Sequence, residues 1–211
     1  MNGATDFVHV VEPADRPQAP TLLLLHGTGA DERDLLPLGR ALAPGAARLS
    51  PRGKVDENGM NRWFRRLREG VFDVEDVIAR AAELADWLPT ALDRHELASP
   101  VVAVGFSNGA NIAAALMLLH PALLDGAVLL GGGYPLQGRD PGRADLTGKA
   151  VFLGAGTADP ISTVDQARLL ADHLAARGAQ VEAAEHPGGH SVPPQVLEGA
   201  RAWFQNRYGQ N

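Results

Sequence analysis

The sequence predicts an α/β fold in which a mostly parallel central sheet carries helices on both faces. Short apolar runs bounded by glycine or proline alternate with longer segments whose apolar residues recur every three or four positions. The apolar runs are nearly continuous in valine, leucine and alanine, which is typical of parallel strands buried on both faces. With 211 residues, the chain is long enough for one such domain and too short for two ordinary ones. We therefore expect a single domain over residues 1–211.

The two kinds of segment can be placed along the chain. Strands are predicted over residues 7–11, 21–25, 46–49, 101–106, 126–130, 150–154 and 180–185. Helices are predicted over residues 34–42, 74–94, 108–120, 163–177 and 194–208. Asp73 and Ser162 are expected to cap the second and fourth helices. Pro89 is expected to kink or divide the long second helix.

The charge balance and the lack of cysteine exclude several classes of protein. The formal net charge of −6 repels nucleic-acid backbones and anionic membrane surfaces, so we expect no nucleic-acid partner and no stable membrane anchoring. Without cysteine, the chain has no disulfide and no thiol nucleophile. Its first residues lack a cationic stretch followed by an apolar run, so a cytoplasmic location is expected.

A Gly-x-Ser-x-Gly motif, Gly105-Phe106-Ser107-Asn108-Gly109, joins a predicted strand directly to a predicted helix. Such a turn forces its corner residue into a strained backbone conformation, and the flanking glycines remove Cβ atoms that would collide there. The serine side chain then projects into the open at a helix N-terminus, whose N–H groups favour an anion. We therefore predict Ser107 as a nucleophile, in preference to an incidental serine in a phosphate-binding type of turn.

An acid and a base for this serine are expected in loops after later strands, in the order serine, acid, histidine. Asp159 ends the turn-rich loop after the sixth predicted strand, and His190 follows two glycines in the loop after the seventh. Ordinary turn formation is the alternative role for Asp159, and Asp165 is its competitor, although Asp165 suits the first turn of a helix. His186, near a strand end, is the second choice as base. The predicted catalytic triad is Ser107, Asp159 and His190.

The loop after the second predicted strand, His26-Gly27-Thr28-Gly29, is expected to complete an oxyanion hole. Acyl transfer needs two backbone donors, one from the residue after the nucleophile and one from an early loop. We predict that these are the amides of Asn108 and Thr28. His26 is expected to form structural hydrogen bonds because it precedes the serine. His9, His95, His120 and His173 do not pair at metal-ligand spacing, so no metal site is expected.

Five short motifs are distributed over nearly the whole chain. They are Leu-Leu-His-Gly-Thr-Gly at 24–29, Leu-Ser-Pro-Arg-Gly at 49–53, Gly-Phe-Ser-Asn-Gly at 105–109, Asp-Pro at 159–160 and Gly-Gly-His at 188–190. Together they resemble the phospholipase/carboxylesterase family of α/β hydrolases, which includes bacterial carboxylesterases and acyl-protein thioesterases. The family commonly has glutamine after the nucleophile, whereas this chain has Asn108, which keeps the backbone donor but does not carry over thioesterase specificity.

The resemblance implies the α/β-hydrolase fold and a cofactor-free serine carboxylesterase. Its substrates are expected to be small to medium carboxylic esters, and its state a monomer or homodimer. Acyl thioesterase or lysophospholipase activity on the same triad is the alternative within enzymes. A non-catalytic binding protein with this fold is the alternative from another class, but loss of a triad residue would then be expected and none is seen.

Substrate contacts are predicted first in the segment 57–66, which places Trp63 and Phe64 beside Arg65 and Arg66. The aromatic groups suit an acyl chain, and one arginine suits a carboxylate. The interpretation we favour is a solvated basic loop whose Trp63 and Phe64 pack in the core.

A second group of candidate contacts follows the fifth predicted strand. Tyr134 and Leu136 are predicted as a further wall of the substrate pocket. The segment 131–149 is too short for a large lid, so an open cleft is expected.

Overall fold

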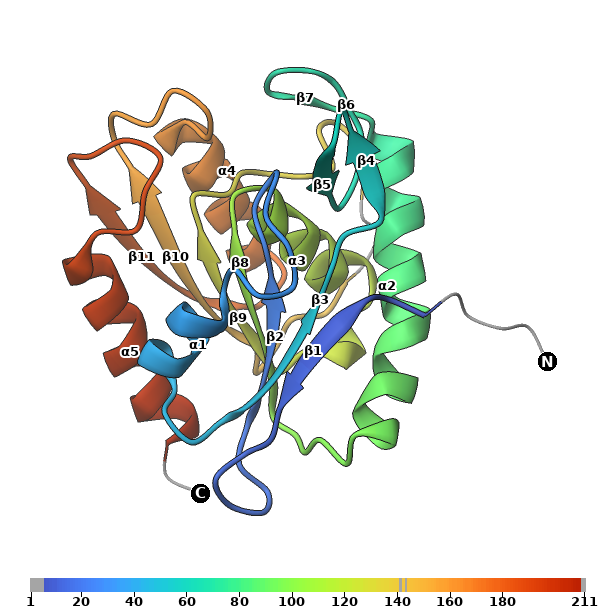
Figure 1. Cartoon of the computed structure of the whole chain (residues 1–211). Helices are drawn as coiled ribbons and strands as arrows, with labels where there is room; N and C mark the ends of the chain where they lie inside the picture. Colours follow the sequence, from blue (N-terminus) through green and yellow to red (C-terminus); the bar gives the residue numbers. More distant parts are fainter. Residues whose placement is uncertain (1–5, 141, 143, 210–211) are drawn as a thin grey trace.

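A seven-stranded sheet organises the protein, with the strand order β1-β3-β2-β8-β9-β10-β11 (Figure 1). The computed structural model describes residues 6–140, 142 and 144–209. The strands are β1 (His9–Glu12), β2 (Thr21–Leu25), β3 (Ala47–Pro51), β8 (Val101–Phe106), β9 (Gly126–Leu130), β10 (Ala150–Gly156) and β11 (Gln180–His186). Only β1 is antiparallel to its neighbour, which confirms the predicted mostly parallel sheet. The carboxyl ends of the six parallel strands therefore meet at one edge, the upper edge in Figure 1.

Helices cover both faces of the sheet, as predicted. They are α1 (Leu36–Leu42), α2 (Val74–Arg94), α3 (Asn108–Leu119), α4 (Val164–Ala175) and α5 (Pro194–Tyr208), with a short 3-10 helix η1 (Pro121–Leu123). Successive residues of β2 point to opposite faces: Leu22 belongs to the core under α1 and α5, and Leu23 to the core under α2, α3 and α4. Each face of the sheet thus has its own apolar layer.

Two details of the helices differ from the sequence prediction, and one agrees with it. Asp73 caps α2, since its side chain accepts a hydrogen bond from the N–H of Asp76. Pro89 was expected to kink or divide α2; the helix runs unbroken through Pro89, so the prediction of a division is wrong, and the kink stays a prediction. Helix α4 is capped by Thr163 and not by Ser162, because the N–H of Ser162 donates to Asp159 in the preceding loop.

Two small hairpins lie between β3 and α2, where the sequence predicted a basic loop. Strands β4 (Val55–Glu57) and β5 (Met60–Arg62) form the first, and β6 (Arg66–Arg68) and β7 (Val71–Phe72) form the second. The turn of the first hairpin has φ 55° at Asn58 and φ 81° at Gly59, the conformation that favours an Asn-Gly pair. Both hairpins rise at the upper end of the molecule in Figure 1, the end that carries the strand carboxyl ends.

The described residues lack two features, namely regular structure between β9 and β10 and a helix suited to span a membrane. Residues 131–140, 142 and 144–149, between β9 and β10, contain neither helix nor strand. Among the described helices, none combines the length and the apolar character that a membrane span requires.

Candidate active site

The turn from β8 to α3 places Ser107 at a strained corner of the backbone. Ser107 has φ 55° and ψ −117°, and its N–H donates a 2.8 Å hydrogen bond to the carbonyl of Leu130. A Cβ on Gly105 would lie 2.5 Å from the carbonyl carbon of Gly109, and a Cβ on Gly109 would lie 1.8 Å from the carbonyl oxygen of Leu25. The strained corner expected of the motif is therefore present, and only glycine fits on either side of it.

The structure brings Ser107, His190 and Asp159 into one hydrogen-bonded chain. Nε2 of His190 lies 2.8 Å from Oγ of Ser107, and Nδ1 lies 2.6 Å from Oδ2 of Asp159. In the neutral imidazole, Nδ1–H then donates to the carboxylate and Nε2 accepts from the serine hydroxyl. A base oriented by an acid is thus within reach of the serine proton.

Asp159 is held by its own loop. Its side chain is buried, and Oδ1 accepts hydrogen bonds from the N–H groups of Ile161 at 2.8 Å and Ser162 at 3.0 Å. Oδ2 is left to face His190. The carboxylate therefore has a fixed orientation toward the imidazole.

The two alternatives weighed for the acid and the base lie apart from this chain of hydrogen bonds. His186 is buried at the end of β11, and its Nδ1 accepts from the N–H of Gly188 at 3.1 Å. Asp165 lies in the first turn of α4 with 87% of its side chain exposed, and it pairs with Arg168. Neither contacts Ser107.

Thr28 and Asn108 lie on either side of the nucleophile and line the same cleft as Ser107. Within the described part of the chain, the N–H groups of both residues make no hydrogen bond. Asn108 is the first residue of α3, so its N–H lies at the positive end of the helix dipole. Two residues with unpaired N–H groups among the described residues thus line the cleft that also contains Ser107.

His26, just before Gly27, is buried, and each of its two ring nitrogens forms a hydrogen bond. Its Nδ1–H donates to the carbonyl of Gly27 at 2.7 Å, and its Nε2 accepts from the N–H of Gly53 at 3.0 Å. Burial lowers the pKa of His26, which favours the neutral ring that this bonding pattern needs. The structural role expected for His26 is the one it has.

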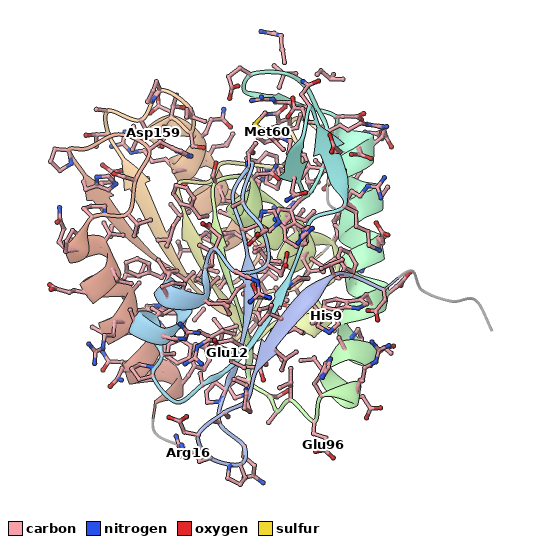
Figure 2. All side chains as sticks on the ribbon, in the orientation of Figure 1. His9, Glu12, Arg16, Met60, Glu96 and Asp159 are labelled. Atoms are coloured by element: carbon pink, nitrogen blue, oxygen red, sulfur yellow. The ribbon has the colours of Figure 1, made fainter. Side chains whose placement is uncertain are left out.

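Ser107 opens onto a cleft of about 510 Å³. Three large apolar side chains contribute to its lining, namely Phe72, Phe106 and Ile161. Arg62 and Arg66 add positive charge, and Asp34 and Glu69 add negative charge. Figure 2 shows Asp159 and Met60, from the acid loop and from β5, at the same end of the molecule, with Arg16 and Glu96 at the opposite end. The cleft thus lies at the strand carboxyl ends, under the two hairpins.

None of the five residues predicted as substrate contacts lines this cleft. Trp63, Phe64 and Leu136 are at most 2% exposed and belong to the apolar core. Arg65 pairs with the carboxylates that begin α2, outside the cleft. Tyr134 stacks on a histidine of α4 and lines a neighbouring hollow of about 630 Å³.

Arg66, the other arginine weighed in the segment 57–66, does line the cleft, whereas the remaining residues of its wall were not predicted as substrate contacts. Phe106 adjoins the nucleophile within the Gly-x-Ser-x-Gly motif, so its place could have been inferred from the motif alone. Arg62 ends β5 and directly precedes Trp63, so it lies within the segment 57–66 in which substrate contacts were predicted. Phe72 and Ile161 carry no comparable signal.

Comparisons with known proteins identify relatives of the chain. A family model described as Phospholipase/Carboxylesterase matches residues 7–206. The Bacillus subtilis (strain 168) protein MhqD, named as a putative hydrolase, is 44% identical over 185 residues, which cover 87% of this chain and 92% of MhqD. The crystal structure of the Bacillus cereus carboxylesterase has a TM-score of 0.89 and 42% identity, covering 93% of this chain and 92% of that one. A carboxylesterase from Mesorhizobium loti has a TM-score of 0.83 and 33% identity, covering 90% and 89%.

Proposed function

The chain belongs to the phospholipase/carboxylesterase family of α/β hydrolases, and from that premise we propose that it is a serine carboxylesterase. Membership makes the protein a hydrolase and accounts for its α/β-hydrolase fold, the fold expected from the sequence. The observation that carries the proposal is the chain of hydrogen bonds from Ser107 through His190 to Asp159, at the base of an open cleft.

In the proposed reaction, Nε2 of His190 takes the proton of Ser107 as Oγ attacks the carbonyl carbon of an ester. The carbonyl oxygen becomes an oxyanion, and the imidazole becomes a cation that Asp159 stabilises. His190 then returns the proton to the leaving alcohol as its bond to carbon breaks, which leaves an acyl group on Ser107. Water repeats the sequence on the acyl-enzyme and releases the carboxylic acid.

The oxyanion is assigned to the amides of Thr28 and Asn108. Both N–H groups lack a partner within the described residues, and both belong to residues that line the cleft. One such donor typically contributes about 2.7 to 4 kcal/mol to lowering the barrier. Two donors in place before the reaction therefore provide a large share of the catalysis.

The cleft supports small to medium esters as substrates. Its volume of about 510 Å³ lies within the range of small-molecule sites, and Phe72, Phe106 and Ile161 give it an apolar part. A cytoplasmic location and a monomeric or homodimeric state belong to the same proposal.

The test is covalent labelling of the nucleophile, followed by its removal. A fluorophosphonate is expected to modify Ser107, and mass spectrometry of peptides identifies the site. Ser107→Ala is expected to lower kcat for a p-nitrophenyl ester about 10⁶-fold. The matched control is Ser191→Ala, since Ser191 follows His190 but is exposed. Folded protein that stays unlabelled, or a Ser107→Ala variant that keeps its activity, would contradict the proposal.

A further inference from the structure

Strand β5 is hydrogen-bonded to the loop that contains Thr28, one of the two proposed oxyanion donors. The carbonyl of Asn61 accepts a 2.9 Å hydrogen bond from the N–H of Gly29, and Nδ2 of Asn61 donates to the carbonyl of Ala30 at 2.9 Å. Next to these bonds in the chain, Nη1 of Arg62 donates to Oγ1 of Thr28 at 3.0 Å. Three consecutive residues of the loop are therefore held by two residues of the hairpin.

The next residue, Trp63, reaches the second oxyanion donor. Its N–H donates to Oδ1 of Asn108 at 2.7 Å, and its indole N–H donates to the carbonyl of His26 at 2.9 Å. Residues 61–63, which we call the brace, thus contact both the loop after β2 and the first residue of α3. No other segment among the described residues makes side-chain hydrogen bonds to both Thr28 and Asn108.

Arg62 is the central residue of the brace and is firmly anchored. The residue is 3% exposed, its Nε donates to the carbonyl of Phe64 at 3.1 Å, and its Nη1 lies 3.1 Å from Oε2 of Glu57. Burying a charged pair costs free energy that well-packed apolar side chains would not cost, so stability alone does not account for it. The planar guanidinium has several N–H donors in fixed directions and contacts Thr28, Phe64 and Glu57 at once. The ammonium group of a lysine lacks this planar arrangement of donors.

We propose that the brace sets the separation of the Thr28 and Asn108 amides, and that Arg62 is a positioning residue for the oxyanion hole. This inference rests on the proposed function, because it assigns those two amides to the oxyanion. The loop between Gly27 and Gly29 lies beyond the end of β2, so its position depends on contacts from outside the sheet. A donor displaced by a fraction of an ångström stabilises the transition state less, while substrate binding in the cleft is little affected.

The test removes the hydroxyl that Arg62 holds and keeps the backbone donor. Thr28→Val is nearly isosteric with the native residue and is expected to lower kcat about tenfold, with KM within about twofold of the native value. The inhibition constant of an alkyl boronic acid, whose adduct with Ser107 imitates the tetrahedral intermediate, is expected to rise by the same factor. Thr28→Ser restores the hydroxyl and is expected to recover most of the loss.

The matched control is Thr21→Val at the start of β2, the strand that leads into this loop. Oγ1 of Thr21 donates to the carbonyl of Ala98 at 2.7 Å, so this variant also loses one hydroxyl hydrogen bond, far from the cleft. We expect it to lower the melting temperature without changing kcat. Arg62→Lys provides a second route, because lysine keeps the charge opposite Glu57 but not the guanidinium fork, and it is expected to show the same selective loss of kcat.

The experiments distinguish a failure of the proposed brace from a failure of the proposed esterase function. Labelling of Ser107 in the native protein tests the proposed function by itself. If Ser107 is labelled and kcat in Thr28→Val and Arg62→Lys stays within threefold of the native value, the brace is overturned and the esterase proposal stands. An equal loss in Thr28→Ser, or a rise in KM with no change in kcat, would also overturn the brace.

Discussion

Nδ1 of His190 lies 2.6 Å from Oδ2 of Asp159, although 31 positions separate the two residues in the chain. Their loops follow the adjacent parallel strands β10 and β11 and are bonded to each other. The N–H of Thr157 donates to the carbonyl of His186 at 2.8 Å, and the N–H of Ala158 donates to the carbonyl of Gly188 at 3.1 Å. The acid and the base are therefore parts of one rigid unit at the edge of the sheet.

Asp159→Asn is expected to lower kcat by about 10⁴-fold, the magnitude seen when the acid of another serine hydrolase triad is converted to its amide. Asparagine can still accept from Ile161 and Ser162 through Oδ1, so the loop keeps its shape. The amide group facing His190 favours the wrong tautomer, with the proton on Nε2. Steady-state kinetics measure the loss, with the exposed Asp165→Asn as control. A variant that retains a tenth of native kcat would argue against Asp159 as the acid.

Gly109→Ala is expected to lower the free energy of unfolding by about 3 kcal/mol or more, because the new Cβ would lie 1.8 Å from the backbone oxygen of Leu25. Gly199→Ala in α5 makes the same change where the Cβ would be 3.4 Å from the ring of Phe152, and helix propensity favours alanine there. Urea denaturation compares the two proteins. Equal stability would show that the turn at Ser107 tolerates a side chain.

Phe72→Ala is expected to raise kcat/KM for long-chain p-nitrophenyl esters relative to short-chain ones, since Phe72 is half-buried in the cleft wall. Removing its ring lengthens the apolar space available to the substrate. The ratio of kcat/KM for an octanoate to that for a butyrate measures this change. Leu67→Ala, on the same hairpin and 71% exposed, is the control and should leave the ratio unchanged. An unchanged ratio in Phe72→Ala would place substrate binding elsewhere.

The stability of the protein is expected to fall as the pH drops below about 6.5, partly because of His26. Burial lowers the pKa of His26 in the folded protein, so the unfolded chain takes up a proton that the folded protein does not. The free energy of unfolding therefore rises with pH between the pKa of His26 in the folded protein and its ordinary value of 6.5. Above pH 6.5 the contribution of His26 is fully present.

His26→Gln removes this proton uptake and isolates the effect. The difference in unfolding free energy between the native protein and the variant is expected to shrink from pH 7 to pH 5. Burial also lowers the pKa of His120, but that residue is present in both proteins and cancels in the difference. A difference that does not change with pH would show that His26 titrates normally in the folded state.

The parts of the fold that could be predicted are those whose signals are local. The buried strands β2, β8 and β9 have the predicted bounds because a short apolar run between turn residues allows few alternatives. The strained corner at Ser107 was predictable for the same reason, since strand, glycine, serine and helix follow one another directly. The Asn-Gly pair at 58–59 is likewise a local signal for the β4–β5 hairpin, although this segment was predicted as a loop.

The sequence by itself predicted the class of fold and the candidate residues of the triad from strand periodicity, turn chemistry and chain order, and the resemblance of its motifs implied the family. The structure confirmed that Trp63 and Phe64 pack in the core, and only the tertiary structure decided that Phe72 and Ile161 line the cleft and that Arg62 holds Thr28. The physical reason is that these contacts join segments far apart in the chain. The side a residue faces, and the partner it meets, depend on how the hairpins pack over the sheet.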